Sequence, residues 1–150
     1  MPYDLTLTRQ FDASVDRVWA CWTEARRLER WFGPNDVDVD LADFDLREGG
    51  RYRVVLRGHE SGKLFPMRGV FEVIDPKTRL VFTHGWEDES GAVATDTRIT
   101  VTLSPKGTGT ELVFTQTGLT GEASRASHED GWSQALENLQ KHLEKALQPG

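Results

Sequence analysis

The stretch that decides the fold is SRASHEDGWSQALENLQKHLEKAL, Ser124 to Leu147, close to the C-terminal end of the sequence. At about 100° per residue, three leucines fall within about 40° of Trp132 on a helical wheel: Leu136, Leu139 and Leu143. Most of the remaining positions hold charged or amide side chains. The spacing therefore predicts one long amphipathic helix that covers the apolar face of another layer.

The first third of the chain predicts a strand followed by two short helices. Residues 3–11, YDLTLTRQF, alternate well enough for a strand. Four apolar residues then follow helical spacing, Val15, Val18, Trp19 and Trp22. Asp12 and Ser14 are the candidate N-caps of this helix. We expect a second short helix to end at Trp31 and Phe32, because Gly33 and Pro34 follow.

Six further strand patterns lie between residues 35 and 118, separated by segments that contain Gly, Pro and Asp. The first pattern holds two sets of apolar residues in opposite phase, Val37, Val39 and Leu41, then Phe44 and Leu46. A strand changes phase only at a bulge or break, so we expect a bulge near Ala42 and Asp43. The segment HESGKLFP, residues 59–66, is expected to be a loop. This order of elements predicts an α+β fold with an antiparallel sheet.

Length, charge and cysteine content narrow the class of protein. The chain has 150 residues, and we expect a single domain over residues 1–150. Its formal net charge of −6 argues against a nucleic-acid partner, which favours a basic surface. No apolar run reaches the roughly 20 residues of a membrane-spanning helix, and the first residues do not resemble a secretory signal. With Cys21 as its one cysteine, the chain is expected in the cytoplasm.

The histidine in HEDGW, residues 128–132, does not belong to a helical zinc site. That signature needs a second histidine four residues later, where this chain has Trp132. His142 is 14 residues beyond His128, roughly 21 Å along a helix. The acidic series at residues 36, 38 and 40 lacks the glycine and glutamate of a calcium loop, since Leu41 and Arg47 stand there. We expect no metal site and no cofactor.

The chain resembles a known family along most of its length. The matching stretches are FDASVDRVWACWT, LERWFGP, DLREGGRYR, RGVFEVIDPKTRLVFTHGW, GTELVFTQTGL and HEDGWSQALENLQKHL, in this order between residues 7 and 147. They are similar to the homologues of the activator of the heat-shock protein 90 ATPase, in the START-like (SRPBCC) superfamily of helix-grip folds. The resemblance implies a seven-stranded antiparallel sheet curved around the C-terminal helix, with a cavity between them.

The alternation along the strands and the helical wheel predict which side chains line that cavity. In the strand LVFTHGW, Phe82, His84 and Trp86 point the same way, and in ELVFTQTG so do Phe114 and Gln116. On the final helix His128 lies about 40° from Trp132. The predicted lining is therefore His84, Trp86, Gln116, His128, Trp132, Phe82, Phe114, Leu136 and Trp31. A histidine on an apolar face is also commonly a hydrogen-bonded core residue, and that interpretation stays open for both histidines.

Three functions are compatible with these residues. The leading hypothesis is a non-enzymatic protein that binds a small, largely hydrophobic molecule. The second is an enzyme of cyclase, aromatase or hydrolytic type, acting on an aromatic or polyketide-like substrate with His84 or His128 as general base. No nucleophile, base and orienting group are found together, so no catalytic residue is assigned. The third is a co-chaperone-like interaction module, and the oligomeric state, a homo-oligomer included, stays open.

Overall fold

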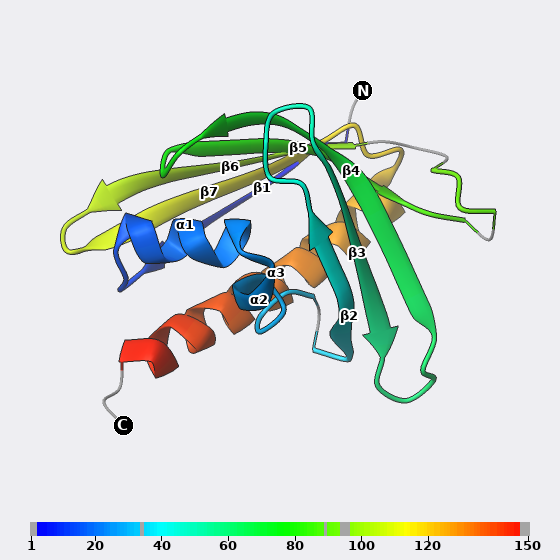
Figure 1. Cartoon of the computed structure of the whole chain (residues 1–150), viewed down its shortest axis with the longest axis horizontal. Coiled ribbons are helices and arrows are strands. Elements are labelled where there is room, and N and C mark those ends of the chain that lie inside the picture. The colour runs from blue at the N-terminus through cyan, green and yellow to red at the C-terminus, as the bar shows by residue number, and fades with distance from the viewer. Residues whose placement is uncertain (1–2, 34, 89, 94–96, 148–150) are drawn as a thin grey trace.

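The computed structural model describes residues 3–33, 35–88, 90–93 and 97–147, which form an antiparallel sheet and its covering helices (Figure 1). The elements are β1 (Leu5–Phe11), α1 (Val15–Thr23), α2 (Ala25–Leu28), β2 (Val37–Phe44), β3 (Arg51–Gly58), β4 (Leu64–Asp75), β5 (Arg79–Trp86), β6 (Thr97–Lys106), β7 (Gly109–Thr117) and α3 (Glu122–Leu147).

The sheet has seven strands in the order β1-β7-β6-β5-β4-β3-β2, and every neighbouring pair is antiparallel. Figure 1 shows it arching over α3, with α1 and α2 on the same side of the sheet. The expected α+β helix-grip fold, with its long C-terminal helix and two short helices after the first strand, is confirmed.

The helix α3 packs through the face that its sequence predicts. Leu136 and Leu139 are completely buried, and Leu143 and Trp132 are nearly so. The strand β7 alternates between buried and half-buried residues, so that one of its faces lies against this apolar stripe. Burial of a leucine side chain contributes about 1.5–3 kcal/mol, which makes this contact a major source of the stability of the fold.

The first short helix begins where the sequence predicts, and the second ends earlier than expected. Ser14 caps α1, its side chain accepting from the backbone N–H of Arg17 at 3.3 Å. The helix α2 ends at Leu28, so the expected end at Trp31 and Phe32 was wrong. Beyond Leu28 the chain tightens, with the Trp31 N–H bonded to the Leu28 carbonyl three residues earlier. This tight turn buries the Trp31 indole, whose N–H donates to the carbonyl of Cys21 at 3.0 Å.

The predicted bulge of β2 exists but lies about two residues before the expected position. The pairing with β3 shifts between Val39 and Leu41, not at Ala42 and Asp43. Asp40 is the additional residue, and its carboxylate pairs with Arg57 at 2.9 Å. The phase therefore changes before Leu41, which is left exposed.

A chain of buried hydrogen bonds ties α3 to three strands. The indole N–H of Trp132 donates to Gln116 Oε1 on β7 at 3.0 Å. The Gln116 amide N–H donates to Thr97 Oγ1 on β6 at 2.8 Å, and the Thr97 hydroxyl donates to the backbone carbonyl of His84 on β5 at 2.9 Å. Gln116 and Thr97 each accept one hydrogen bond of this series and donate the next one. The series therefore fixes the position of the Trp132 indole over the sheet.

Replacing Gln116 by leucine should destabilise the protein, because the buried Trp132 N–H then loses its acceptor. We expect the free energy of unfolding to fall by about 1–3 kcal/mol in urea denaturation. The matched control is Gln140→Leu on the exposed side of α3, for which the change should stay within about 0.5 kcal/mol. Equal stabilities of the two variants would contradict this role of Gln116.

Candidate functional site

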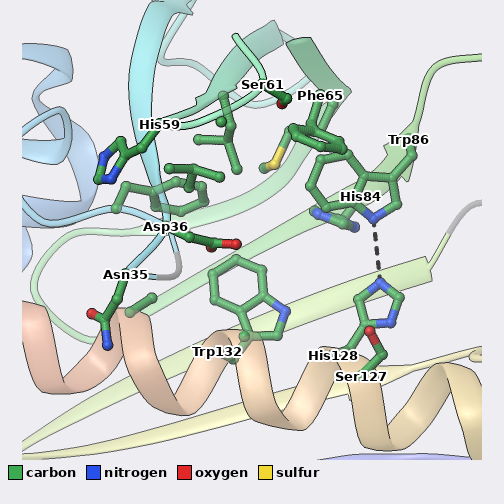
Figure 2. Close-up of a pocket in the computed structure, with 18 of the residues that line it drawn as sticks. Asn35, Asp36, His59, Ser61, Phe65, His84, Trp86, Ser127, His128 and Trp132 are labelled. Carbon is green, nitrogen blue, oxygen red and sulfur yellow. Dashed lines mark hydrogen bonds between the residues drawn. The ribbon is translucent and has the colours of Figure 1, made fainter. Parts of the chain in front are cut away.

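A pocket of about 760 Å³ lies between the first half of α3 and the strands β3, β4 and β5. Figure 2 shows it in close-up, with Trp132 and His128 rising from the helix on one side and Phe65, His84 and Trp86 on the sheet side. The connections α2–β2 and β3–β4 form its rim. The first residue of β2, Val37, also lines the pocket, so the site is built from one helix, four strands and two loops that are far apart in the sequence.

The wall on α3 consists of His128, a large aromatic residue and small neighbours. Trp132 lines the pocket together with Gly131, Ser127 and Ala135. The Trp132 ring is also part of the core, since its centroid lies 4.6 Å from that of Phe114. Trp132 thus separates the open pocket from the packed interior. Gly131 costs helix stability of about 1 kcal/mol relative to alanine, and its missing side chain leaves room in the pocket.

The wall on the sheet is apolar apart from one histidine. Leu56 on β3, Phe65 and Met67 on β4, and His84 and Trp86 on β5 face the pocket. Trp86 is 40% exposed, which places this aromatic ring partly in solvent. The site has large aromatic and aliphatic surfaces with few polar groups, the composition of a small-molecule pocket.

The rim carries the charged groups. Asp36 lies in the α2–β2 connection, and Figure 2 shows its carboxylate pointing into the cavity toward Trp132. Glu60 lies in the β3–β4 connection, while the neighbouring His59 pairs with Asp38 at 3.1 Å. Among the described lining residues there is no lysine or arginine. The Lys63 ammonium lies outside the lining, 5.5 Å from the ring centroid of Phe65.

The hydrogen bonds of His128 define its tautomer. Nδ1 lies 2.7 Å from the backbone carbonyl of Ser124, one helical turn earlier. Because a carbonyl only accepts, the Nδ1 atom donates, and Nε2 is left to accept. The indole N–H of Trp86 donates to this Nε2 at 3.3 Å, the dashed contact in Figure 2. His128 is therefore hydrogen-bonded through both ring nitrogens and joins α3 to β5.

His84 differs from His128 in that one of its nitrogens has no partner. The residue is 1% exposed, and within the described residues its Nε2 atom is buried without a hydrogen bond. The pKa of His84 is lowered from its usual value of 6.5 to about 3, mainly by burial and to a smaller extent by the neighbouring His128, while the polar backbone of the residue itself acts in the opposite direction. At neutral pH the imidazole is therefore uncharged, with Nε2 unsatisfied beside the pocket.

The predicted lining residues separate into two groups. His84, Trp86, His128 and Trp132 line the pocket together. The other five do not, namely Gln116, Phe114, Leu136, Phe82 and Trp31. The first three are completely buried in the core, Phe82 borders a separate void of about 20 Å³, and Trp31 borders another pocket of about 290 Å³. Strand and helix phase gives the direction of a side chain but not the depth at which another residue covers it.

The pocket residues of β3, β4 and the rim were not among the predicted lining residues. The segment that contains Phe65 was expected to be a loop, whereas β4 already begins at Leu64. Phe65 and Met67 are two residues apart on one strand, so their side chains point to the same face of the sheet. The same two-residue spacing identifies His84 and Trp86. No comparable pattern exists for Asp36, because it lies in an irregular connection.

The comparisons with known proteins agree with this architecture. A sequence profile described as "Activator of Hsp90 ATPase homolog 1-like protein" matches residues 12–144. The chain belongs to this family. The resemblance seen in the sequence motifs is thereby confirmed. Among curated proteins, none matches the chain.

Several solved structures share the fold of this family member. Protein CV1439 from Chromobacterium violaceum is 25% identical, with a TM-score of 0.87 over 95% of this chain and 97% of that one. A protein from Arthrobacter aurescens is 29% identical, with a TM-score of 0.85 over 95% and 87%. Protein NE0264 from Nitrosomonas europaea is 26% identical, with a TM-score of 0.80 over 95% of both chains. None of these three proteins is named for a ligand or a reaction.

The metal-ligating and hydroxyl side chains near the pocket can be compared within the part of the chain that the structure describes. Among the described residues, no three His, Cys, Asp or Glu side chains are placed to hold a metal ion. The described lining contains one hydroxyl side chain on α3, Ser127, and one in the β3–β4 connection, Ser61, and neither is hydrogen-bonded to a histidine. The arrangement offers apolar surface and a hydrogen-bonding nitrogen.

Burial of neutral His84 should make the protein less stable in weak acid. The unfolded chain binds a proton near the usual pKa of 6.5, while the folded chain binds it only near 3, so stability is complete above 6.5 and is lost as the pH falls toward 3. Between pH 7 and pH 5 the loss should be about 2 kcal/mol. Urea denaturation at both pH values checks this.

The variant His84→Gln provides the control for this measurement, because it removes the titrating group and leaves the carboxylates unchanged. Its free energy of unfolding should change by about 2 kcal/mol less than that of the wild type over the same interval. The same pH dependence in both proteins would show that other groups cause it.

Proposed function

We propose that the protein binds a small, largely hydrophobic molecule in the pocket between α3 and the strands β3–β5. The observation that carries the proposal is a cavity of about 760 Å³ with aromatic and aliphatic walls on both the helix and the sheet. Pockets for small ligands typically have volumes of about 300–1,000 Å³ and mostly apolar linings with a few polar groups. Membership of a START-like family, whose fold is a ligand-binding scaffold, supports the same proposal.

The charges of the rim favour an uncharged ligand over an anionic one. Asp36 and Glu60 are the carboxylates of the lining, and no lysine or arginine of the described lining opposes them. A carboxylate headgroup placed in this pocket would lose hydration without gaining an ion pair. We therefore propose a neutral, predominantly apolar ligand rather than a fatty-acid-like anion.

The properties of the histidines argue against the acid–base enzyme considered above. A general base works best with a pKa near the working pH, and the pKa of His84 lies at about 3. The Nε2 atom of His128 already accepts the Trp86 N–H, so its lone pair is engaged.

We propose a binding protein of the cytoplasm. No helix among the described residues has the length and apolar character to cross a membrane.

A neutral solvatochromic dye tests this proposal directly. Nile red should bind with a fluorescence increase and a blue shift, because the pocket walls exclude water from the dye. Gly131→Trp places an indole in the pocket and should weaken binding at least tenfold. It should not lower the melting temperature by more than a few degrees, since glycine is the poorer helix former.

The matched control is Gln140→Trp, which adds the same indole to the exposed side of α3, away from the pocket. Its affinity for Nile red should equal that of the wild type. If the wild type does not bind the dye, or if both variants bind it equally well, ligand binding in this pocket is refuted. The interaction-module hypothesis would then be the one to test.

A further inference from the structure

The least expected group in the pocket is the unpaired Nε2 atom of His84. The great majority of buried polar atoms in proteins have a hydrogen-bond partner, and an exception needs an explanation. Here the atom is buried and unpaired, and its residue belongs to the pocket lining. The other pocket histidine, His128, is satisfied through both nitrogens. Of the two histidines that line the pocket on β5 and α3, only His84 has a ring nitrogen without a partner among the described residues.

Three aromatic side chains surround the ring of His84. The centroids of Trp86, Trp132 and His128 lie 5.3, 5.8 and 6.1 Å from that of His84. Trp86 and His128 are joined by one hydrogen bond of 3.3 Å, and Figure 2 shows these two side chains together at one end of the pocket beside His84. Trp86 is 40% exposed, so its ring has room to move toward solvent.

The chemistry of the imidazole selects the partner. A neutral imidazole carries one N–H and one acceptor nitrogen. We take the proton to lie on Nδ1, as it does in His128, which leaves the unpartnered Nε2 of His84 without a proton. Nε2 is then the acceptor, and its complement is a ligand O–H or N–H group. The surrounding rings favour a flat apolar body attached to that group.

We propose that the pocket binds a neutral hydroxylated aromatic molecule, whose hydroxyl donates a hydrogen bond to His84 Nε2 while its ring system packs among Trp86, Trp132 and Phe65. This inference rests on the proposed function and defines the class of ligand for the same pocket. The hydroxyl displaces no existing hydrogen bond of His84. The Trp86 ring shifts from its place beside His84, and binding thus supplies the partner that the free protein lacks.

Three naphthalene probes of similar size test the inference. 2-Naphthol donates a hydrogen bond, 2-methoxynaphthalene does not, and 2-acetylnaphthalene presents only an acceptor. A protein-observed NMR titration gives the affinities, and the indole N–H signals of Trp86 and Trp132 report the place of binding. We expect 2-naphthol to bind about tenfold more tightly than either other probe, a difference of about 1.4 kcal/mol.

Two variants assign this preference to His84. His84→Leu removes the acceptor and should reduce the preference for 2-naphthol to less than about threefold. His84→Gln keeps an acceptor oxygen in a side chain of similar reach and should retain part of the preference. Because the preference is a ratio measured on one sample, a change in the folded fraction affects all probes equally. A merely structural role of His84 would leave the ratio unchanged.

The outcomes separate this inference from the proposed function. If the three probes bind with equal affinity, or if His84→Leu keeps the full preference for 2-naphthol, the hydroxyl contact is refuted and apolar binding stands. Tighter binding of 2-acetylnaphthalene would show that Nε2 donates, which also refutes it. If no naphthalene probe and no Nile red binds, the proposed function fails and this inference with it.

Discussion

The hydrogen bond from the Trp132 indole to Gln116 is the contact on which the arrangement of helix and sheet depends. Apolar packing alone is tolerant of small displacements, but a buried N–H and a buried amide must meet at hydrogen-bond distance. The 3.0 Å contact to Gln116, continued through Thr97 to the carbonyl of His84, gives α3 one position over β5, β6 and β7. An indole without that acceptor would leave an unsatisfied donor inside the protein.

This contact also divides the interior into two parts. Trp132 packs on Phe114 toward the core, and Leu136, Leu139 and Leu143 continue the packed side along α3. On its other side the same indole lines the pocket, where the helix presents Gly131 and Ala135 to the sheet. The dense part supplies the apolar burial that stabilises the fold, so the other part can remain open without loss of the whole structure. A cavity in a small domain requires such a separation.

The polar side chains near the pocket illustrate two different uses of burial. Gln116 is completely buried, and its amide group both accepts and donates hydrogen bonds, so it acts as structure. His84 is equally buried, but its backbone carbonyl is bonded while its ring nitrogen Nε2 is not. Since the two residues lie on the same inner face of the sheet, their neighbours determine the difference. The unsatisfied atom is the feature of this pocket that packing alone does not explain.

The sequence by itself determined the class of fold and the order of its elements, because helical and strand periodicity is a local property of neighbouring residues. It also placed His84, Trp86, His128 and Trp132 on faces that meet. Only the tertiary structure decided that Trp132 covers Gln116 and that Asp36 reaches the pocket. The Asp36 connection is positioned by contacts distant in sequence, from the Asn35 N–H to Gln134 at 3.0 Å and from Asn138 to the Gly33 carbonyl at 3.3 Å. Periodicity gives the direction of a side chain, but which residue covers it depends on contacts between elements that no local pattern encodes.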